Sequence, residues 1–204
     1  MIKYITLFVL LFVYTASLSA QSITSTKSTK VYQGFSGGMM IHGGYVFSQN
    51  MPSGEQFSVS GFTKGIGGNV KVNLWKHLRV GTEGYVSTIG LKNDGYVRTF
   101  WSGLLLEGWS RGKKLSPYGG ATVGGGIQKS LYIFSGNSSD WEKEENVVHH
   151  KSPFFALAPY TGCEVRISEK FSLNFKLEWL LAFNNRTLLM PTGPRLYVGF
   201  LFGH

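Results

Sequence analysis

The chain has 204 residues, of which 43% are hydrophobic, 15% aromatic and 15% charged, with 27 glycines and a formal net charge of +9. This length suits one domain with a full core, and the hydrophobic content excludes intrinsic disorder. The only cysteine, Cys163, excludes an intramolecular disulfide framework and a multi-cysteine metal site. Soluble domains carry about 25% charged residues, whereas this chain carries 15%. The shortage of charged residues, together with the many aromatic residues and glycines, favours a β protein with one face in lipid.

The first twenty residues have the pattern of a secretory signal peptide. A positively charged start precedes an apolar run over 4–14, and small residues follow up to Ala20. The run is shorter than the ~20 apolar residues of a transmembrane helix. We therefore expect 1–20 to be a signal peptide, 21–30 a polar leader and 31–204 the folded domain.

The folded domain alternates between apolar and polar residues, most clearly near its end. Odd positions from Phe171 to Phe183 are all apolar, whereas even positions include Lys176 and Glu178. This period of two is typical of a strand with one apolar face. Pro159 predicts a bulge or an interrupted ladder bond in its strand. We expect strands over residues 32–47, 62–75, 78–91, 96–109, 117–132, 154–167, 171–183 and 194–203.

The connections between these strands differ in length in a regular way. The second, fourth and sixth are short, and the long ones fall among the odd-numbered connections, at 48–61, 133–153 and 184–193. Short turns at one end and longer loops at the other are typical of outer-membrane barrels. The tight hairpin signal at 93–95 is the exception on the long-loop side. The pattern predicts an all-β fold, an eight-stranded antiparallel up-and-down transmembrane β-barrel.

Alternation does not by itself say which face is outside, because a soluble lipocalin-like barrel exchanges the two faces. The low charge content and the aromatic last strand, with Phe200 and Phe202, favour lipid outside. A soluble periplasmic barrel is the alternative fold. Aromatic girdles are expected from Trp75, Trp109, Phe171 and Phe202 at one end and from Phe47, Tyr96, Phe134, Phe155 and Phe183 at the other.

With the apolar face outward, the charged residues of the strands point into the lumen. They comprise five cations and four anions, and buried charges persist only when they are paired. An eight-stranded barrel is just wide enough for side chains to fill it, so we expect a filled lumen without an open pore. The predicted lumen ion-pair network consists of Lys71, Arg79, Glu83, Glu107, Glu164, Arg166, Lys176, Glu178 and Arg195.

Residues 117–124, PYGGATVG, resemble the Pro-Tyr-x-Gly-x-x-x-Gly strand opening of porin-like barrel families, including those of Bacteroidota. Over nearly all of 31–204 the chain is similar to the small outer-membrane β-barrel proteins of Gram-negative bacteria. The resemblance implies an outer-membrane location and the outer-membrane assembly machinery as a partner. It leaves the activity open, because this family includes adhesins, assembly factors and lipid-modifying enzymes.

The function expected first is non-enzymatic, in envelope integrity or surface binding through the extracellular loops. Trp141, Asn137 and Ser138 are the candidate loop contacts with an extracellular ligand. Outer-membrane lipid and lipopolysaccharide are the expected partners of a monomer, and secretion removes nucleic acid as a partner. No catalytic residue, cofactor or metal is expected.

Two other functions stay open. A rim-active enzyme that modifies lipid A or phospholipid would need His42 beside a serine such as Ser36 or Ser48. A narrow transporter of small or hydrophobic compounds is the other. The pair His149 and His150 near the acidic run 140–145 could bind a divalent ion, but this segment is interpreted as a solvated acidic loop.

Overall fold

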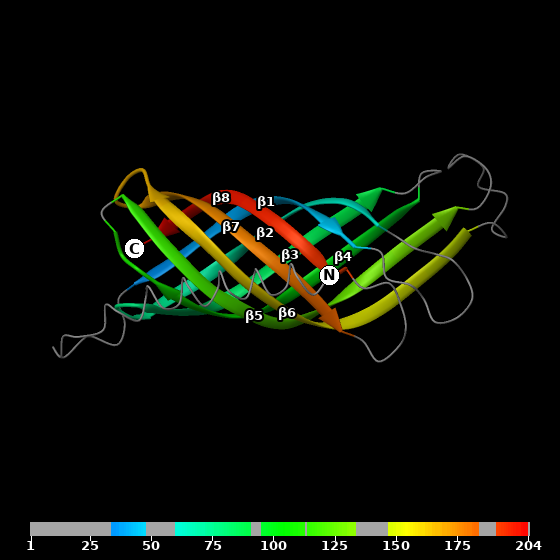
Figure 1. The fold of residues 1–204 in the computed structure, drawn as a ribbon, viewed down its shortest axis with the longest axis horizontal. Coiled ribbons are helices and arrows are strands. Elements are labelled where there is room, and N and C mark those ends of the chain that lie inside the picture. The colour runs from blue at the N-terminus through cyan, green and yellow to red at the C-terminus, as the bar shows by residue number, and fades with distance from the viewer. Residues whose placement is uncertain are drawn as a thin grey trace.

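The computed structural model describes residues 34–47, 60–90, 95–112, 114–133, 147–183 and 191–203. These residues form one closed barrel in which each strand pairs antiparallel with its neighbours in sequence and β8 closes on β1 (Figure 1). The predicted eight-stranded antiparallel barrel is confirmed. Within the described ranges, no helix is long and apolar enough to cross a membrane. The strands are β1 (Phe35–Val46), β2 (Gly61–Trp75), β3 (Leu78–Gly90), β4 (Tyr96–Trp109), β5 (Leu115–Ile133), β6 (Val147–Arg166), β7 (Phe171–Phe183) and β8 (Gly193–Gly203).

Seven strands match the predicted ranges to within three residues, but β6 begins seven residues earlier than predicted. The additional residues pair with β5, up to Ile133 opposite Val147, and β7 joins β6 only from Phe155. This hairpin extends beyond the other strands (Figure 1). Pro153 lies in this extension. Proline has no backbone N–H to donate, but no strand pairs with the β7 side of β6 at this point, so no ladder bond is lost on that side.

Pro159 interrupts one ladder without shifting it. The β6–β7 pairs run from Leu157 opposite Leu181 to Tyr160 opposite Glu178, with the same register on both sides of the proline. Of the two expected outcomes, the interrupted ladder bond is therefore found, and the bulge is not.

The two ends of the barrel differ. The connections 76–77, 110–114 and 167–170 lie at one end together with the last residues of β8, and this end is called the short-turn end below (Figure 1). The opposite end is called the long-connection end. Its connecting segments, 48–59, 91–94, 134–146 and 184–190, lie outside the described residues.

The barrel wall has an apolar outside and a polar inside. Phe62 and Leu104 on the outside are 74% and 70% exposed, whereas Lys176 and Glu178 inside are buried. Trp109 departs from the predicted girdle, because it shares the inward face of β4 with Glu107 and is buried. Of the other aromatic residues expected at the short-turn end, Trp75 and Phe202 are exposed on the outside, and Phe171 is half-buried.

Candidate functional site

The lumen contains two charged clusters, and the first lies near the short-turn end. Lys71 Nζ lies 2.8 Å from Glu107 Oε2 and 3.7 Å from Glu164 Oε1. Arg79 donates to the same two carboxylates, at 3.1 Å to Glu107 Oε1 and 2.5 Å to Glu164 Oε1. Two cations thus share two anions, and these four residues are called the mouth cluster.

Aromatic side chains enclose the mouth cluster. The guanidinium of Arg79 lies 3.6 Å from the centre of the Trp109 ring, and the ammonium of Lys71 lies 4.5 Å from that of Tyr118. Such cation–π contacts strengthen when water is excluded. Tyr160 donates a further hydrogen bond to Glu107 at 3.3 Å.

The second charged cluster lies farther from the short-turn end than the mouth cluster and is called the central cluster. Lys176 donates to both oxygens of Glu83, at 2.9 and 2.7 Å. Its Nζ also lies 2.6 Å from Glu178 Oε2, an ion pair without hydrogen-bond geometry. Thr122 donates to Glu83 at 2.5 Å, and Tyr197 donates to Glu178 at 2.7 Å.

A polar link and an apolar layer occupy the lumen beside these clusters. Tyr118 donates to Asn174 at 2.6 Å, and Asn174 donates to the sulfur of Met40 at 3.1 Å. Buried side chains pack together there and fill this part of the lumen. This packed layer contains Met40, Tyr85, Trp101, Phe154, Ala156, Ala158, Leu180, Ala182 and Tyr197.

A histidine and a serine meet in the half of the lumen nearer the long-connection end. His42 Nε2 lies 2.8 Å from Ser87 Oγ, and both residues are buried. Arg195 also donates to Ser87, at 3.3 Å, and to the carbonyl of Pro191 at 3.3 Å. His42 Nδ1 has no hydrogen-bond partner among the described residues, so no carboxylate there orients the ring.

The structure brings seven of the nine predicted network residues into ion pairs. Arg195 is buried but forms hydrogen bonds rather than an ion pair with a described residue. Arg166 departs from the prediction: it is the last residue of β6, and its side chain is exposed at the short-turn end. The buried charges are therefore four cations, Lys71, Arg79, Lys176 and Arg195, and four anions, Glu83, Glu107, Glu164 and Glu178.

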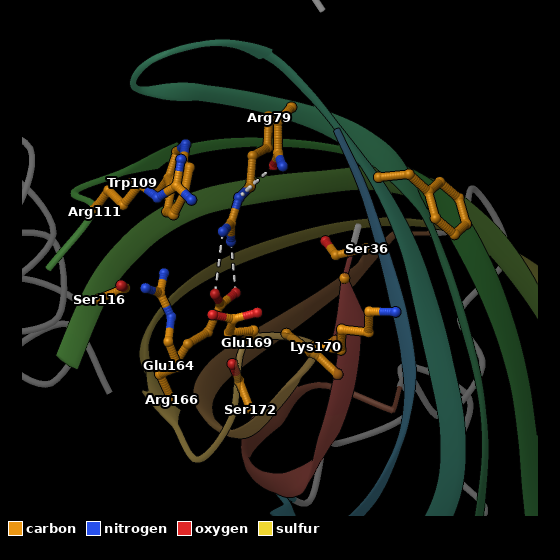
Figure 2. A pocket seen from close by; sticks show the side chains of 14 residues that line it. Ser36, Arg79, Trp109, Arg111, Ser116, Glu164, Arg166, Glu169, Lys170 and Ser172 are labelled. Atoms are coloured by element: carbon orange, nitrogen blue, oxygen red, sulfur yellow. Dashed lines mark hydrogen bonds and ion pairs between the residues drawn. The ribbon is translucent and has the colours of Figure 1, made fainter. Parts of the chain in front are cut away.

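A cavity of about 320 Å³ opens at the short-turn end, next to the mouth cluster. Figure 2 shows the Arg79–Glu164 pair at this cavity, with Arg111 and Arg166 also lining it. Ser36 Oγ is buried there without a hydrogen-bond partner among the described residues. The rim cations can attract small anions, but the guanidinium of Arg79 is already occupied by carboxylates.

Sequence reasoning missed the neutral partners of the network, namely its tyrosines and Thr122 and Asn174. Asn174 lies two residues from Lys176, and Tyr197 lies two residues from Arg195, so strand alternation places each pair on the same inward face. This alternation could have identified them. Sequence reasoning also missed Ser87 as the partner of His42. Ser36 lies six residues before His42, nearer the short-turn end, where it pairs with Lys71 whereas His42 pairs with Gly65.

The remaining candidates are placed as follows. Trp141, Asn137, Ser138 and Ser48 lie outside the described residues. His149 and His150 belong to β6 rather than to a loop. Among the described residues, no group of three potential metal ligands comes together.

No protein-family model and no curated protein matches the sequence. Solved structures of small barrels do match. Neisserial surface protein A has a TM-score of 0.52 at 13% identity, over 83% of this chain and 96% of that one. Ail, the attachment invasion locus protein of Yersinia pestis, in complex with the heparin analogue sucrose octasulfate, has 0.53 at 11% identity, over 84% and 99%. The outer membrane protein OprG from Pseudomonas aeruginosa has 0.56 at 12% identity, over 85% and 96%. At these identities the likeness concerns the fold.

Proposed function

We propose that this protein is a non-enzymatic outer-membrane β-barrel with a closed lumen, which acts in envelope integrity or surface binding at its long-connection end. The observation that carries the proposal is an apolar outer wall around a buried, charge-balanced interior. A soluble barrel would have the opposite arrangement, with charges outside and an apolar inside. We further propose that residues 1–20 act as a signal peptide for secretion and that the assembly machinery inserts the barrel.

The height of the apolar wall supports a membrane location. Nine residues separate Ile66 from Trp75 on β2, and a strand rises about 3.4 Å per residue. This stretch covers roughly 30 Å along the strand, or roughly 23 Å along the barrel axis at a usual tilt of about 40°. The outward apolar band of outer-membrane barrels is about 25 Å tall.

The filled lumen argues against a diffusion pore. The mouth and central clusters reach across the interior, and Arg79 of β3 contacts Glu164 of β6. Moving water or a solute through would require buried ion pairs to separate, which is costly because each charge would lose its partner in a medium of low dielectric. The narrow transporter is therefore the less favoured function.

The similar structures support the same class of function. By their names, one is a surface protein, one an attachment and invasion protein and one an outer membrane protein. Attachment to an outside partner would use the long-connection end, where the candidate contacts Trp141, Asn137 and Ser138 belong by sequence.

The test combines cell fractionation, electrophoresis and planar-bilayer recording of the full chain. We expect the protein in the outer-membrane fraction, with a mobility that changes on boiling and no stable single-channel conductance. Recovery from the soluble periplasmic fraction would overturn the membrane location. A stable, sizeable conductance would overturn the closed lumen.

A second candidate function, a lipid-modifying hydrolase, rests on the contact between His42 and Ser87. A histidine within hydrogen-bond reach of a serine can act as the general base for a nucleophilic hydroxyl. Three features disfavour it: both side chains are buried, Arg195 also donates to Ser87, and no described acid orients His42. Ser87→Ala should leave envelope lipids unchanged in mass spectra, and a fluorophosphonate probe should not label the native protein. Labelling that is lost in Ser87→Ala would establish the enzyme.

A further inference from the structure

Basic side chains form a row on the outside of the barrel, near the long-connection end. In the ladder register Arg98 of β4 faces Lys129 of β5, and Lys129 faces Lys151 of β6. All three side chains are exposed. The row continues from Arg98 through Thr88 to Lys64 on β2. The three adjacent cations Arg98, Lys129 and Lys151 are called the basic ladder.

This arrangement is unfavourable unless an anion lies on it. Side chains directly opposite on antiparallel strands have Cβ atoms about 5 Å apart, and like charges there repel. No outward-facing acid compensates within the described strands, because their four glutamates all point into the lumen. The interior thus contains four cations and four anions. On the outer face of the described strands, in contrast, all charged residues are cations.

The position of the basic ladder indicates what kind of anion it meets. The next outward residues toward the short-turn end are apolar, including Phe100 and Ile127 opposite each other. Lys129 lies 5.7 Å from the Phe100 ring centre, and Arg98 lies 5.2 Å from that of Tyr96. Cations and aromatic rings directly above an apolar band are typical of the membrane interface. A ligand on this row would carry its anionic groups above apolar chains.

The spread of the basic ladder favours a ligand with more than one phosphate. Neighbouring strands lie about 4.8 Å apart, and at a tilt of about 40° each step also rises roughly 3 Å along the axis. From Arg98 to Lys151 the row therefore climbs roughly 6 Å, close to the thickness of one headgroup layer, about 5–8 Å. Several phosphates on one headgroup match three closely spaced cations better than the single phosphate of a phospholipid.

We propose that the basic ladder is a binding site for a multiply phosphorylated lipid headgroup, of the lipid A type, in the leaflet at the long-connection end. The inference rests on the outer-membrane location of the proposed function. It adds a site for the lipopolysaccharide that is expected as a partner: lipid phosphates accept hydrogen bonds from Arg98, Lys129 and Lys151 and neutralise their charges, while the acyl chains lie on the apolar wall below.

The test compares nanodiscs of zwitterionic phosphatidylcholine that contain lipid A or phosphatidylglycerol at equal added charge. Retained lipid is measured by native mass spectrometry for the wild type and for R98Q/K129Q/K151Q. A matched control, K76Q/K114Q/K170Q, neutralises three exposed cations at the short-turn end. We expect the wild type and the control to retain lipid A, and the ladder variant to bind it about 100-fold more weakly, at about fivefold per cation.

Several outcomes would overturn the proposal. If the ladder variant retained as much lipid A as the wild type, the basic ladder would not be the binding site. If the wild type retained as much phosphatidylglycerol as lipid A, the site would not select a multiply phosphorylated headgroup. The acids at 142, 144 and 145 give a third arm: if they neutralised the ladder, E142Q/E144Q/E145Q would bind more lipid A than the wild type, and we expect no change. Heat-modifiable mobility of every variant in the membrane distinguishes these failures from failure of the proposed function.

Discussion

Arg79 and Glu164 form two parallel hydrogen bonds across the lumen, Nη1 to Oε1 at 2.5 Å and Nη2 to Oε2 at 3.1 Å. They belong to β3 and β6, which share no ladder. A bidentate pair of this kind fixes geometry as well as charge. The contact therefore joins two strands that backbone pairing connects only through β4 and β5.

The stability of the barrel should depend on each carboxylate of the mouth cluster. In Glu107→Gln the charge between Lys71 and Arg79 is lost, which leaves the two cations to share Glu164. Breaking a buried charge pair costs about 3–5 kcal/mol, so the free energy of unfolding should fall by about that amount. Urea unfolding in lipid vesicles, followed by tryptophan fluorescence, measures this.

A double variant supplies the control for this prediction. Lys71→Met together with Glu107→Gln removes one cation with one anion, so the double variant should be destabilised by less than the sum of the two single variants. Lys114→Gln, at an exposed turn position, should change little. Strict additivity would show that Lys71 and Glu107 are not coupled.

Gly162 should not tolerate a methyl group. A Cβ at this position would lie 2.3 Å from the carbonyl oxygen of Phe175 and 2.5 Å from the Tyr118 ring. Overpacking of this kind costs about 1–3 kcal/mol, so Gly162→Ala should unfold at lower urea concentration. Gly90→Ala is the matched control, because no atom of the described residues lies within 4 Å of its added Cβ. Equal stability of the two variants would contradict the close packing at Tyr118.

The faces of the strands were predictable because a period of two has only two possible phases. One charged residue fixes the phase of a strand as far as its register is regular, and the position of Trp109 illustrates this. In β2 the register shifts between Asn73 and Trp75, so Trp75 lies outside although Lys71 lies inside. Glu107 was assigned to the lumen, and Trp109, two residues on, must share its face. The girdle prediction placed Trp109 outside because it considered the end of the strand and not its phase.

The partners across the lumen could not be predicted in the same way. Alternation says that Arg79 and Glu164 both point inward, but whether they meet depends on the stagger of the strands around the barrel. The same uncertainty applies to His42 and Ser87, which lie on strands that are not paired with each other. The early start of β6 was missed because Pro153 and the polar residues around it are typical of a loop.

The opposite faces of Trp75 and Trp109 can be tested by fluorescence quenching. Trp75 is exposed on the outer wall, whereas Trp109 is buried against Arg79. In variants that retain a single tryptophan, brominated lipid should quench Trp75 strongly and Trp109 weakly, because bromine atoms on acyl chains reach only the outer wall. Comparable quenching of both residues would contradict the assignment of the faces.

Cys163 provides a chemical test of the same wall in the unmodified protein. It is a free, half-buried cysteine on the outward face of β6, where it pairs with Pro117 and Phe175. A thiol reacts as the thiolate, and neither a charged maleimide nor hydroxide enters the acyl-chain region readily. In vesicles, Cys163 should therefore resist a charged maleimide and react fully once urea unfolds the barrel, as read from a mobility shift after addition of a maleimide–polyethylene glycol. Rapid labelling of the folded protein in vesicles would place this part of β6 in water and would contradict a lipid-facing outer wall.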